Sequence, residues 1–305
     1  MNILSTNARD LKHKHEDLKN KVKFFQSGIF TIQETHYRTK GKFKMDNYTI
    51  FEAIRKNKEH GGSMIGVHVG LKPVLVKDYD EQFELIVVEI KIGNKSIRVI
   101  TGYGPQEIWK PSEKMDFYVA LEKEIASAEL AGKSYIIAMD ANAKLGPTYI
   151  PGDPHPISQN GKLLSGIIER HAICVANGLV EKRQGIITRE IHTINGIEKS
   201  VIDLVLLSGD LIKHMEYIHV DDKREYVLTN IVKTKKGKEH TKSDHNITNT
   251  KFNLAWTHTE QEQMTTFKDN DNEAKKNFKQ QTTKTHELTK IVDMQKPIDS
   301  DKQTN

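Results

Sequence analysis

Acidic, amide, phenol and imidazole side chains stand at the ends of apolar segments along this sequence. They are Asn7, Glu34, Tyr103, Asp140, Asn142, Asp203, Asp244 and His245. Carboxylates that crowd together repel one another and become protonated unless a cation is present. Oxygen-rich ligand sets favour Mg²⁺ or Mn²⁺ over zinc. A hard metal, a histidine and amides that can donate to phosphate oxygens together suit the hydrolysis of phosphate esters.

The stretch around Asp140 is the strongest local signal for such chemistry. The aliphatic run Ser134–Asp140 lies between Gly132 and Gly146 and predicts a buried strand that ends on Asp140. Asn142 follows two residues later, so the two side chains should point the same way. A carboxylate and an amide at a strand end suggest a reaction site. The alternative is that Asp140 only caps a turn, and this stretch by itself favours neither.

Other predicted strands bring further polar residues to their ends. Residues 1–7 predict a strand that ends on Asn7, and residues 28–36 predict one that ends on the carboxylate of Glu34. Two β-branched runs, 85–90 and 96–101, predict a hairpin that leads into the loop carrying Tyr103. Strand ends in one or two packed sheets can meet at a common edge.

The second half of the chain supplies the remaining acids and the histidine. Asp203 is the only charge within the aliphatic run 201–207, so its carboxylate must be paired or hydrogen-bonded if it is buried. Asp244 and His245 stand just before the last apolar alternation. Between these segments, residues 233–238 predict a lysine-rich hairpin tip, which either grips a nucleic-acid backbone or is simply solvated.

Composition narrows the class of protein. With 46 basic and 41 acidic residues, the formal charge of +5 permits nucleic-acid or phosphate partners without requiring them. A lone cysteine, Cys174, excludes an internal disulfide and a multi-cysteine zinc site, which fits a reducing intracellular compartment. The first residues lack the apolar core of a signal peptide, and no window is long enough to span a bilayer. We therefore expect a protein that is not secreted and has no membrane partner.

The apolar content changes near residue 255. Up to that point the chain can form one large domain, residues 1–255, and Ser112 is expected to cap a helix within it. Residues 256–305 are dominated by Thr, Gln, Lys, Asp and Asn and cannot form a core of their own. We interpret them as a polar, linker-like tail that is partly disordered or weakly helical.

Six short motifs in this order resemble those of the endonuclease/exonuclease/phosphatase family. They are Asn7-Ala-Arg9, Gln33-Glu34-Thr35-His36, Gly102-Tyr103-Gly104-Pro105, Asp140-Ala141-Asn142, Ser200-Val201-Ile202-Asp203 and Ser243-Asp244-His245. Within that family, the chain is most similar to endonuclease domains of LINE-type retrotransposons and to apurinic/apyrimidinic endonucleases. The tail resembles the linker that precedes reverse transcriptase in such elements.

The resemblance implies a fold and a set of roles. The fold would be a four-layer α/β sandwich of two packed, mostly antiparallel sheets flanked by helices. Glu34, positioned by Asn7, and Asp244 would hold Mg²⁺ or Mn²⁺. Asp140 would activate the attacking water with help from Asn142. His245, oriented by Asp203, and Tyr103 would bind the phosphate, and four further residues match family positions near DNA or phosphate: Arg9, Gln106, Thr188 and Ser200.

Two departures from the family pattern lie beside the site. Gln106 stands where an asparagine is usual, and Ala141 stands where an aromatic residue is usual. Neither removes a catalytic group.

The expected activity is metal-dependent nicking of DNA by direct water attack. The resemblance also implies a monomer, a nuclear location suited to a DNA substrate, and tethering to a reverse transcriptase in the parent element. Two alternatives stay open: a phosphatase or lipid phosphodiesterase on the same scaffold, and an inactive DNA-binding remnant of such an element.

Overall fold

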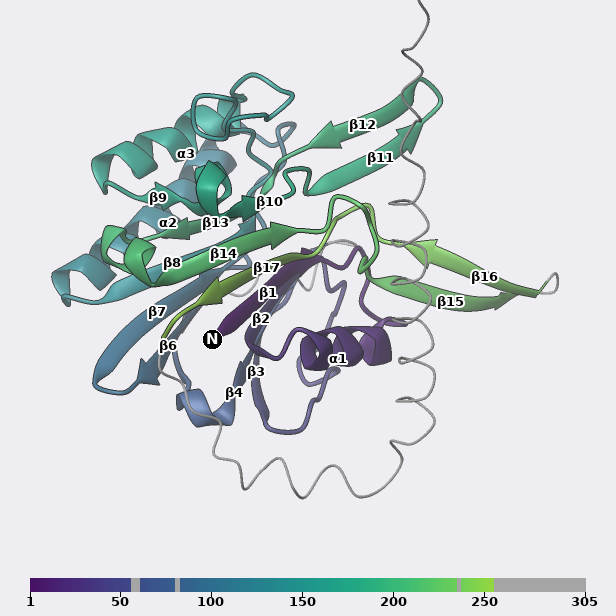
Figure 1. The fold of residues 1–305 in the computed structure, drawn as a ribbon, viewed down its shortest axis with the longest axis horizontal. Helices are drawn as coiled ribbons and strands as arrows, with labels where there is room; N and C mark the ends of the chain where they lie inside the picture. The colour runs from purple at the N-terminus through teal and green to yellow at the C-terminus, as the bar shows by residue number, and fades with distance from the viewer. Residues whose placement is uncertain (56–60, 80–82, 235–236, 255–305) are drawn as a thin grey trace, which may run out of the picture. The chain divides into compact units, whose positions relative to one another are not determined.

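Two β-sheets pack face to face in the computed structural model, which describes residues 1–55, 61–79, 83–234 and 237–254 (Figure 1). The predicted tail, residues 256–305, lies outside the described residues. The first sheet has the order β10 (Arg183–Gln184), β14 (Met215–Val220), β17 (Thr248–Phe252), β1 (Asn2–Asn7), β2 (Ser27–Gln33), β4 (Ser63–His68) and β3 (Tyr48–Ala53). The second has the order β5 (Val74–Asp78), β6 (Ile86–Ile92), β7 (Lys95–Thr101), β8 (Ser134–Asp140), β13 (Asp203–Leu207) and β9 (Cys174–Val175).

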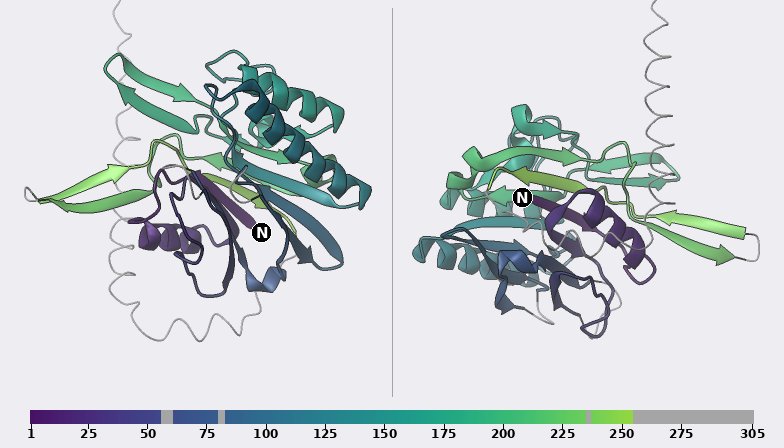
Figure 2. Two further views of the ribbon diagram at one scale, coloured as in Figure 1. Left: turned by 180° about the vertical axis from the view of Figure 1, so that it is seen from behind. Right: turned by 60° about the horizontal axis from the view of Figure 1, so that its bottom comes forward.

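Three helices cover the outer faces of the sheets. Helix α1 (His15–Phe24) packs on the first sheet through Leu18 and Val22. Helices α2 (Pro111–Leu130) and α3 (Gln159–Arg170) pack on the second sheet. Short 3₁₀ segments span Val69–Leu71, Ala176–Gly178, Val180–Lys182 and Gly209–His214. The layers are therefore helix, sheet, sheet and helices, which confirms the predicted four-layer α/β sandwich (Figure 2).

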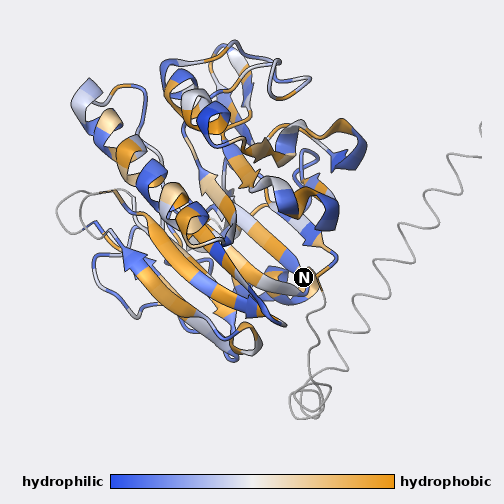
Figure 3. Cartoon of the chain, turned by 90° about the vertical axis from the view of Figure 1, so that its left-hand side faces the viewer, coloured by the Kyte–Doolittle hydropathy of each residue, from blue (hydrophilic) through white to orange (hydrophobic). Residues whose placement is uncertain are grey.

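Strand β8 shows why its sequence is a continuous apolar run. Ile136 and Ala138 face the core between the two sheets, whereas Ile137 and Met139 face the core under α2 and α3. A strand buried on both faces has no polar side, so the period-two alternation of a half-buried strand is absent. Figure 3 shows the same pattern, with hydrophobic residues concentrated along the strands.

Most strand pairs are antiparallel, as predicted. The exceptions are the parallel pairs β1 with β2, β7 with β8, and β10 with β14. Two hairpins, β11 (Arg189–Thr193) with β12 (Gly196–Ser200) and β15 (Thr229–Thr234) with β16 (Gly237–Lys242), extend from the body of the molecule (Figures 1 and 2). The second of these confirms the hairpin predicted around residues 233–238.

The expectation that Ser112 caps a helix is wrong. Helix α2 begins one residue earlier, at Pro111, and the carboxylate of Glu113 accepts a hydrogen bond from the backbone of Lys110. Proline is favoured at the first helical position because its missing N–H would be unpaired there. Among the described residues, no helix is long and apolar enough to cross a membrane.

Candidate active site

The candidate residues meet at one edge of the sandwich because strand ends and strand starts lie side by side there. Strands β1 and β8 finish at this edge, on Asn7 and Asp140. Strand β13 is antiparallel to β8, so its first residue, Asp203, lies opposite Asp140. His245 likewise precedes β17, which runs antiparallel to β1. Asp203 thus begins its strand, whereas the sequence prediction placed it within an apolar run, and His245 precedes its strand as predicted.

A buried cluster of two carboxylates and one imidazole forms the centre of this edge. The Nδ1 atom of His245 lies 3.0 and 2.9 Å from the two carboxylate oxygens of Asp203. Its Nε2 atom lies 3.8 Å from Oδ2 of Asp140. One ligand atom from each of the three residues falls within 4.8 Å of the others. The aspartate therefore fixes which imidazole nitrogen faces Asp140.

The environment of this cluster raises the pKa values of both Asp140 and His245. Burial and the Asp203 carboxylate raise the pKa of Asp140 to about 7, although His245 and the Asn7 amide act against the rise. Burial alone would lower the pKa of His245, but Asp203 and Asp140 raise it to about 9. Asp140 is thus poised to accept a proton, while His245 is held as a charged donor.

Asn7 joins this cluster to Glu34. Its Nδ2 atom donates to Oδ2 of Asp140 at 2.9 Å and to Oε1 of Glu34 at 3.0 Å. Its Oδ1 atom accepts the backbone N–H of Arg9 at 2.8 Å, so the amide is oriented with its donors toward the carboxylates. Asn7 therefore positions both acids, and its oxygen is already occupied.

Glu34 is held as a charged carboxylate. Burial would raise its pKa, but hydrogen bonds from His36, Asn7 and Tyr103 lower the pKa of Glu34 to about 2. The His36 Nε2 atom lies 3.4 Å from Oε2 of Glu34. His36, which has no assigned role in the sequence prediction, therefore touches the site directly.

A glycine turn supports the bend that carries Glu34. Glu34 has a φ of 50°, and the following Thr35 and His36 donate backbone N–H groups to the carbonyls of Gly62 and Gly61. A Cβ on Gly62 would lie 2.6 Å from the Thr35 hydroxyl, so this close approach needs glycine. The buried Glu84 accepts the N–H of Gly62 and pairs with Arg55.

The loop residues near Asp140 are placed by backbone contacts. Tyr103 forms a bridge with Asp140, and its hydroxyl accepts a hydrogen bond from Gln106 at 3.0 Å. The backbone N–H of Asn142 donates to Oδ1 of Asp140 at 3.0 Å, while the Asn142 side chain donates to Gly104 O at 2.9 Å. Asp140 thus caps a turn, which is one of the two predicted alternatives, and it also takes part in the cluster.

Asn142 does not follow the strand alternation that was used to orient it. Strand β8 ends at Asp140, and Asn142 has a φ of 45°. Its backbone carbonyl accepts the side-chain amide of Asn160 at 3.0 Å. The loop, and not the pleat of the strand, therefore sets the direction of its side chain.

Thr188 has a different place from the one expected near DNA. It is completely buried, and its hydroxyl accepts the backbone N–H groups of Ile202 and Asp203 at 2.9 and 3.0 Å. It therefore positions Asp203 from behind. Ser200 lies at the end of β12 and lines a pocket of about 220 Å³ together with Asn142, Lys144, Arg189 and Lys199.

Asp244, which precedes His245 in the sequence, pairs with two arginines, Arg9 and Arg189. Oδ1 of Asp244 lies 3.5 Å from a guanidinium nitrogen of Arg9, and Oδ2 accepts from Arg189 Nε at 3.2 Å. Arg224 donates to the backbone carbonyls of Asp244 and Ser243, which holds the loop that carries His245. Arg189 and Arg224 belong to none of the six motifs. The sequence does not reveal their roles, because each contacts a distant segment, residues 243–244, that it meets only in the fold.

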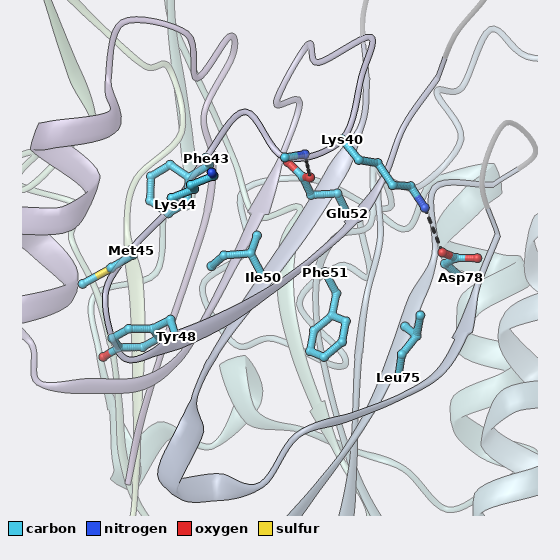
Figure 4. A pocket seen from close by; sticks show the side chains of 11 residues that line it. Lys40, Phe43, Lys44, Met45, Tyr48, Ile50, Phe51, Glu52, Leu75 and Asp78 are labelled. Atoms are coloured by element: carbon cyan, nitrogen blue, oxygen red, sulfur yellow. Dashed lines mark hydrogen bonds and ion pairs between the residues drawn. The ribbon is translucent and has the colours of Figure 1, made fainter.

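A larger pocket than the one beside Ser200 lies away from these residues. It has a volume of about 560 Å³ and lies between β3 and β5, where Lys40 pairs with Asp78 at 2.9 Å (Figure 4). None of the candidate site residues lines it. This pocket is therefore separate from the cluster around Asp140.

The donor set fits a divalent cation. Glu34, Asp140 and Asp203 bring three buried or partly buried carboxylates to one edge, beside the imidazoles of His245 and His36. The raised pKa of Asp140, caused first by burial and then by the Asp203 carboxylate, shows that negative charge there is not fully compensated. A hard cation coordinated by Glu34 beside Asp140 would relieve it.

Comparisons with known proteins agree with this architecture. No family model and no curated protein matches the sequence. The endonuclease domain of TRAS1, a telomere-specific non-LTR retrotransposon, is 18% identical with a TM-score of 0.60, covering 83% of this chain and 99% of that one. The 3'-5' exonuclease NExo from Neisseria meningitidis is 16% identical with a TM-score of 0.64, covering 83% and 100%.

A third solved structure has the same fold. An AP endonuclease from Archaeoglobus fulgidus is 15% identical with a TM-score of 0.59, covering 83% of this chain and 100% of that one. The chain therefore has the endonuclease/exonuclease/phosphatase fold that the six motifs predicted.

Proposed function

We propose that this chain is a metal-dependent DNA endonuclease that nicks a strand by direct attack of water on phosphorus. The observation that carries the proposal is the buried cluster of Asp203, His245 and Asp140, joined through Asn7 to Glu34. The similar structures are those of a retrotransposon endonuclease domain, an exonuclease and an AP endonuclease, which supports a nucleic-acid substrate.

Asp140 is the proposed general base. A water hydrogen-bonded to its carboxylate would lose a proton to it as the water oxygen bonds to phosphorus. The pKa of Asp140, about 7, leaves a substantial unprotonated fraction at neutral pH. The P–O bond to the leaving strand then breaks, and the departing oxygen takes a proton from solvent. Asn142 would hold the loop that places water and phosphate.

His245 is the proposed donor to the phosphate. Its Nδ1 faces Asp203, so the Nε2–H is available to a non-bridging oxygen as negative charge develops. Tyr103 and Gln106 form a hydrogen-bonded pair beside Asp140 and would bind another phosphate oxygen. Asp203 acts through His245 by fixing its tautomer and raising its basicity.

Mg²⁺ or Mn²⁺ is the proposed cofactor, held by Glu34, and when bound it would neutralise charge on the phosphate. Asn7 would keep the Glu34 carboxylate in place. We further propose that the enzymatic domain spans residues 1–255 and that the protein is a monomer derived from a retrotransposon, tethered to a reverse transcriptase in the parent element. Its proposed location is the nucleus.

A nicking assay on supercoiled plasmid tests the proposal. We expect nicking with Mg²⁺, none with EDTA, and a loss of at least about 100-fold for Asp140→Asn and for His245→Ala. Nicking that persists in either variant would remove the assigned roles. DNA binding without any turnover would indicate an inactive remnant.

A phosphatase activity is the second candidate. One similar structure is described as the 3' phosphatase NExo bound to a product DNA hairpin. Release of inorganic phosphate from a 3'-phosphorylated oligonucleotide, with intact plasmid left uncut, would favour this candidate. Hydrolysis of soluble inositol phosphates or sphingomyelin without nicking would favour a lipid phosphodiesterase.

A further inference from the structure

A second charged cluster lies directly beside the proposed centre. We propose that Arg9 and Arg189 bind a phosphate that flanks the scissile one in a polynucleotide strand, and that Asp244 holds these two arginines instead of a metal. This inference rests on the proposed function, because it assumes that a phosphodiester is cleaved at Asp140. It adds Arg189 to the phosphate-binding role that the resemblance implied for Arg9, assigns both to a flanking phosphate, and changes the assignment of Asp244.

The geometry of Asp244 is that of a carboxylate shared by two cations. Its Oδ1 lies 3.5 Å from Arg9 and its Oδ2 lies 3.2 Å from Arg189, so each oxygen faces a different guanidinium group. The Asp244 side chain is only 10% exposed, whereas the side chains of Arg9 and Arg189 are 62% and 34% exposed. The acid is thus enclosed, and both bases reach solvent.

Both arginines are anchored to residues of the proposed centre. The backbone N–H of Arg9 donates to Oδ1 of Asn7, and Arg9 has a φ of 45°. Arg189 forms a β-bridge with His245 at the start of β11. Each guanidinium therefore extends from a backbone segment that also positions a catalytic group, which places the pair next to the scissile phosphate.

The net charge of the Arg9, Arg189 and Asp244 side chains favours the binding of an anion over the binding of a metal cation. Two guanidinium groups and one carboxylate leave a net charge of +1, and each guanidinium has five N–H donors, more than Asp244 can accept. The ammonium group of Lys14 adds further positive charge, since it donates to the carbonyls of Ala8 and Arg9. A divalent metal ligated by Asp244 would have to approach through these groups.

The ligand that fits is a phosphate group within a strand. Arginine binds phosphate through paired N–H donors, and the free donors of this pair reach solvent. The pocket of about 220 Å³ shares Arg189 as a wall. Two further bases, Lys144 and Lys199, line it against two acids, Glu107 and Glu198, so bases outnumber acids along it. A substrate with a single phosphodiester offers nothing to this site.

The test compares a strand with a single diester as substrates for the full chain. The substrates are a 20-base-pair duplex and thymidine 5'-p-nitrophenyl phosphate, and the readout is the ratio of their kcat/KM values. Arg9→Gln and Arg189→Gln should each lower this ratio about tenfold, chiefly through KM for the duplex. Arg170→Gln is the matched control, because Arg170 also pairs with a carboxylate, Glu122, but on the helical layer. Equal losses on both substrates would overturn the proposal.

Asp244→Asn separates an arginine holder from a metal ligand. If Asp244 holds the arginines, this variant lowers the duplex preference, and the Mg²⁺ concentration for half-maximal cleavage of the single diester changes less than threefold. A metal ligand would instead raise that concentration at least about tenfold on both substrates. The second result would overturn the assignment.

A binding readout keeps this test apart from the proposed function. If the wild-type chain cleaves neither substrate, duplex binding measured by fluorescence anisotropy still tests the phosphate site of Arg9 and Arg189. Arg9→Gln and Arg189→Gln should then each weaken binding and lower the salt slope by about one. If duplex binding is absent, or is unaffected by both variants, the proposed phosphate site is overturned.

Discussion

A histidine beside two carboxylates is held in its charged form, and at His245 this state depends mainly on Asp203. Asp203 accepts from Nδ1 and lies nearer than Asp140, so it is the main partner that raises the pKa of His245 to about 9 against the effect of burial. At neutral pH the imidazole is then a cation whose Nε2–H can stabilise a phosphorane-like transition state.

Asp203→Asn should therefore move the alkaline limb of the activity profile. The amide cannot stabilise the imidazolium, so the pKa of His245 falls and cleavage declines at a lower pH than in the wild-type chain. We also expect kcat at pH 8 to fall about 10²-fold to 10⁴-fold. The measurement is kcat for plasmid nicking from pH 5.5 to 10. An unchanged alkaline limb would show that the pKa of His245 does not set it.

The carboxylate of Glu34 makes the stability of the fold depend on pH in the acidic range. Its pKa is about 2 in the folded chain against an ordinary value of 4.5, so the folded state binds fewer protons in this range. The stabilisation is fully present above pH 4.5 and is lost as the pH falls through about 2. A shift of this size corresponds to roughly 3 kcal/mol.

Glu34→Gln should flatten the acid side of the stability curve. Urea unfolding in EDTA from pH 5 to 2 should show a steeper loss for the wild-type chain than for this variant, because the glutamine cannot take up the proton. Glu181→Gln, at an exposed position, is the control and should keep the wild-type slope. Parallel curves for all three proteins would contradict the interpretation of Glu34.

Residue types alone predicted much of the candidate site, and there are physical reasons why some of its residues could not be predicted. Asp140, Asp203, Glu34 and His245 are visible because ionisable groups next to aliphatic runs are costly unless they are paired. Arg189 and Glu84 could not be identified, because each acts through a partner from a distant part of the chain. Thr188 matched a family position near DNA, yet its hydroxyl accepts a backbone N–H at the start of β13.

Secondary-structure elements decide which ends of the strands meet, and the sequence does not carry this information fully. The apolar runs predicted β8 and β13, but only their antiparallel register places the start of β13 opposite the end of β8. The side chain of Asn142 shows the same limit, because its positive φ lies beyond the strand that was used to orient it. Register and loop conformation are tertiary properties.

The β15–β16 hairpin offers a prediction at the scale of one element. Its pairing places Lys233 opposite Lys238, and the segment that follows β16 leads directly to Asp244 and His245. If the hairpin contacts the DNA backbone, the double variant Lys233→Gln/Lys238→Gln should lower the slope of log K against log salt by about two. The measurement is duplex binding over a salt series in EDTA.

A second hairpin provides the control for this charge removal. Lys91 and Lys95 lie at the exposed turn between β6 and β7, and β7 begins beside the start of β8, at the end remote from Asp140. Lys91→Gln/Lys95→Gln removes the same charge and should leave the slope unchanged. Equal slopes for both double variants would favour a solvated β15–β16 tip.

At the scale of the whole molecule, the chain closes its first sheet with its last described strand. β17 lies between β14 and β1, and Phe252 exchanges backbone hydrogen bonds with Met1. Leu254 still packs with the core between the sheets. The four layers, their shared core and the edge that carries Asp140 therefore need the chain as far as residue 254, and this agrees with the proposed domain of residues 1–255.

Truncation tests that boundary. A chain of residues 1–255 should keep its thermal midpoint within about 2 °C and its nicking rate within about twofold, because the described contacts that close the sheets end at Leu254. A chain of residues 1–246 should fail to fold cooperatively, since β1 and β14 lose the strand between them. Calorimetry and nicking measure the two outcomes. A large loss of stability on removal of residues 256–305 alone would place part of the folded domain in the tail.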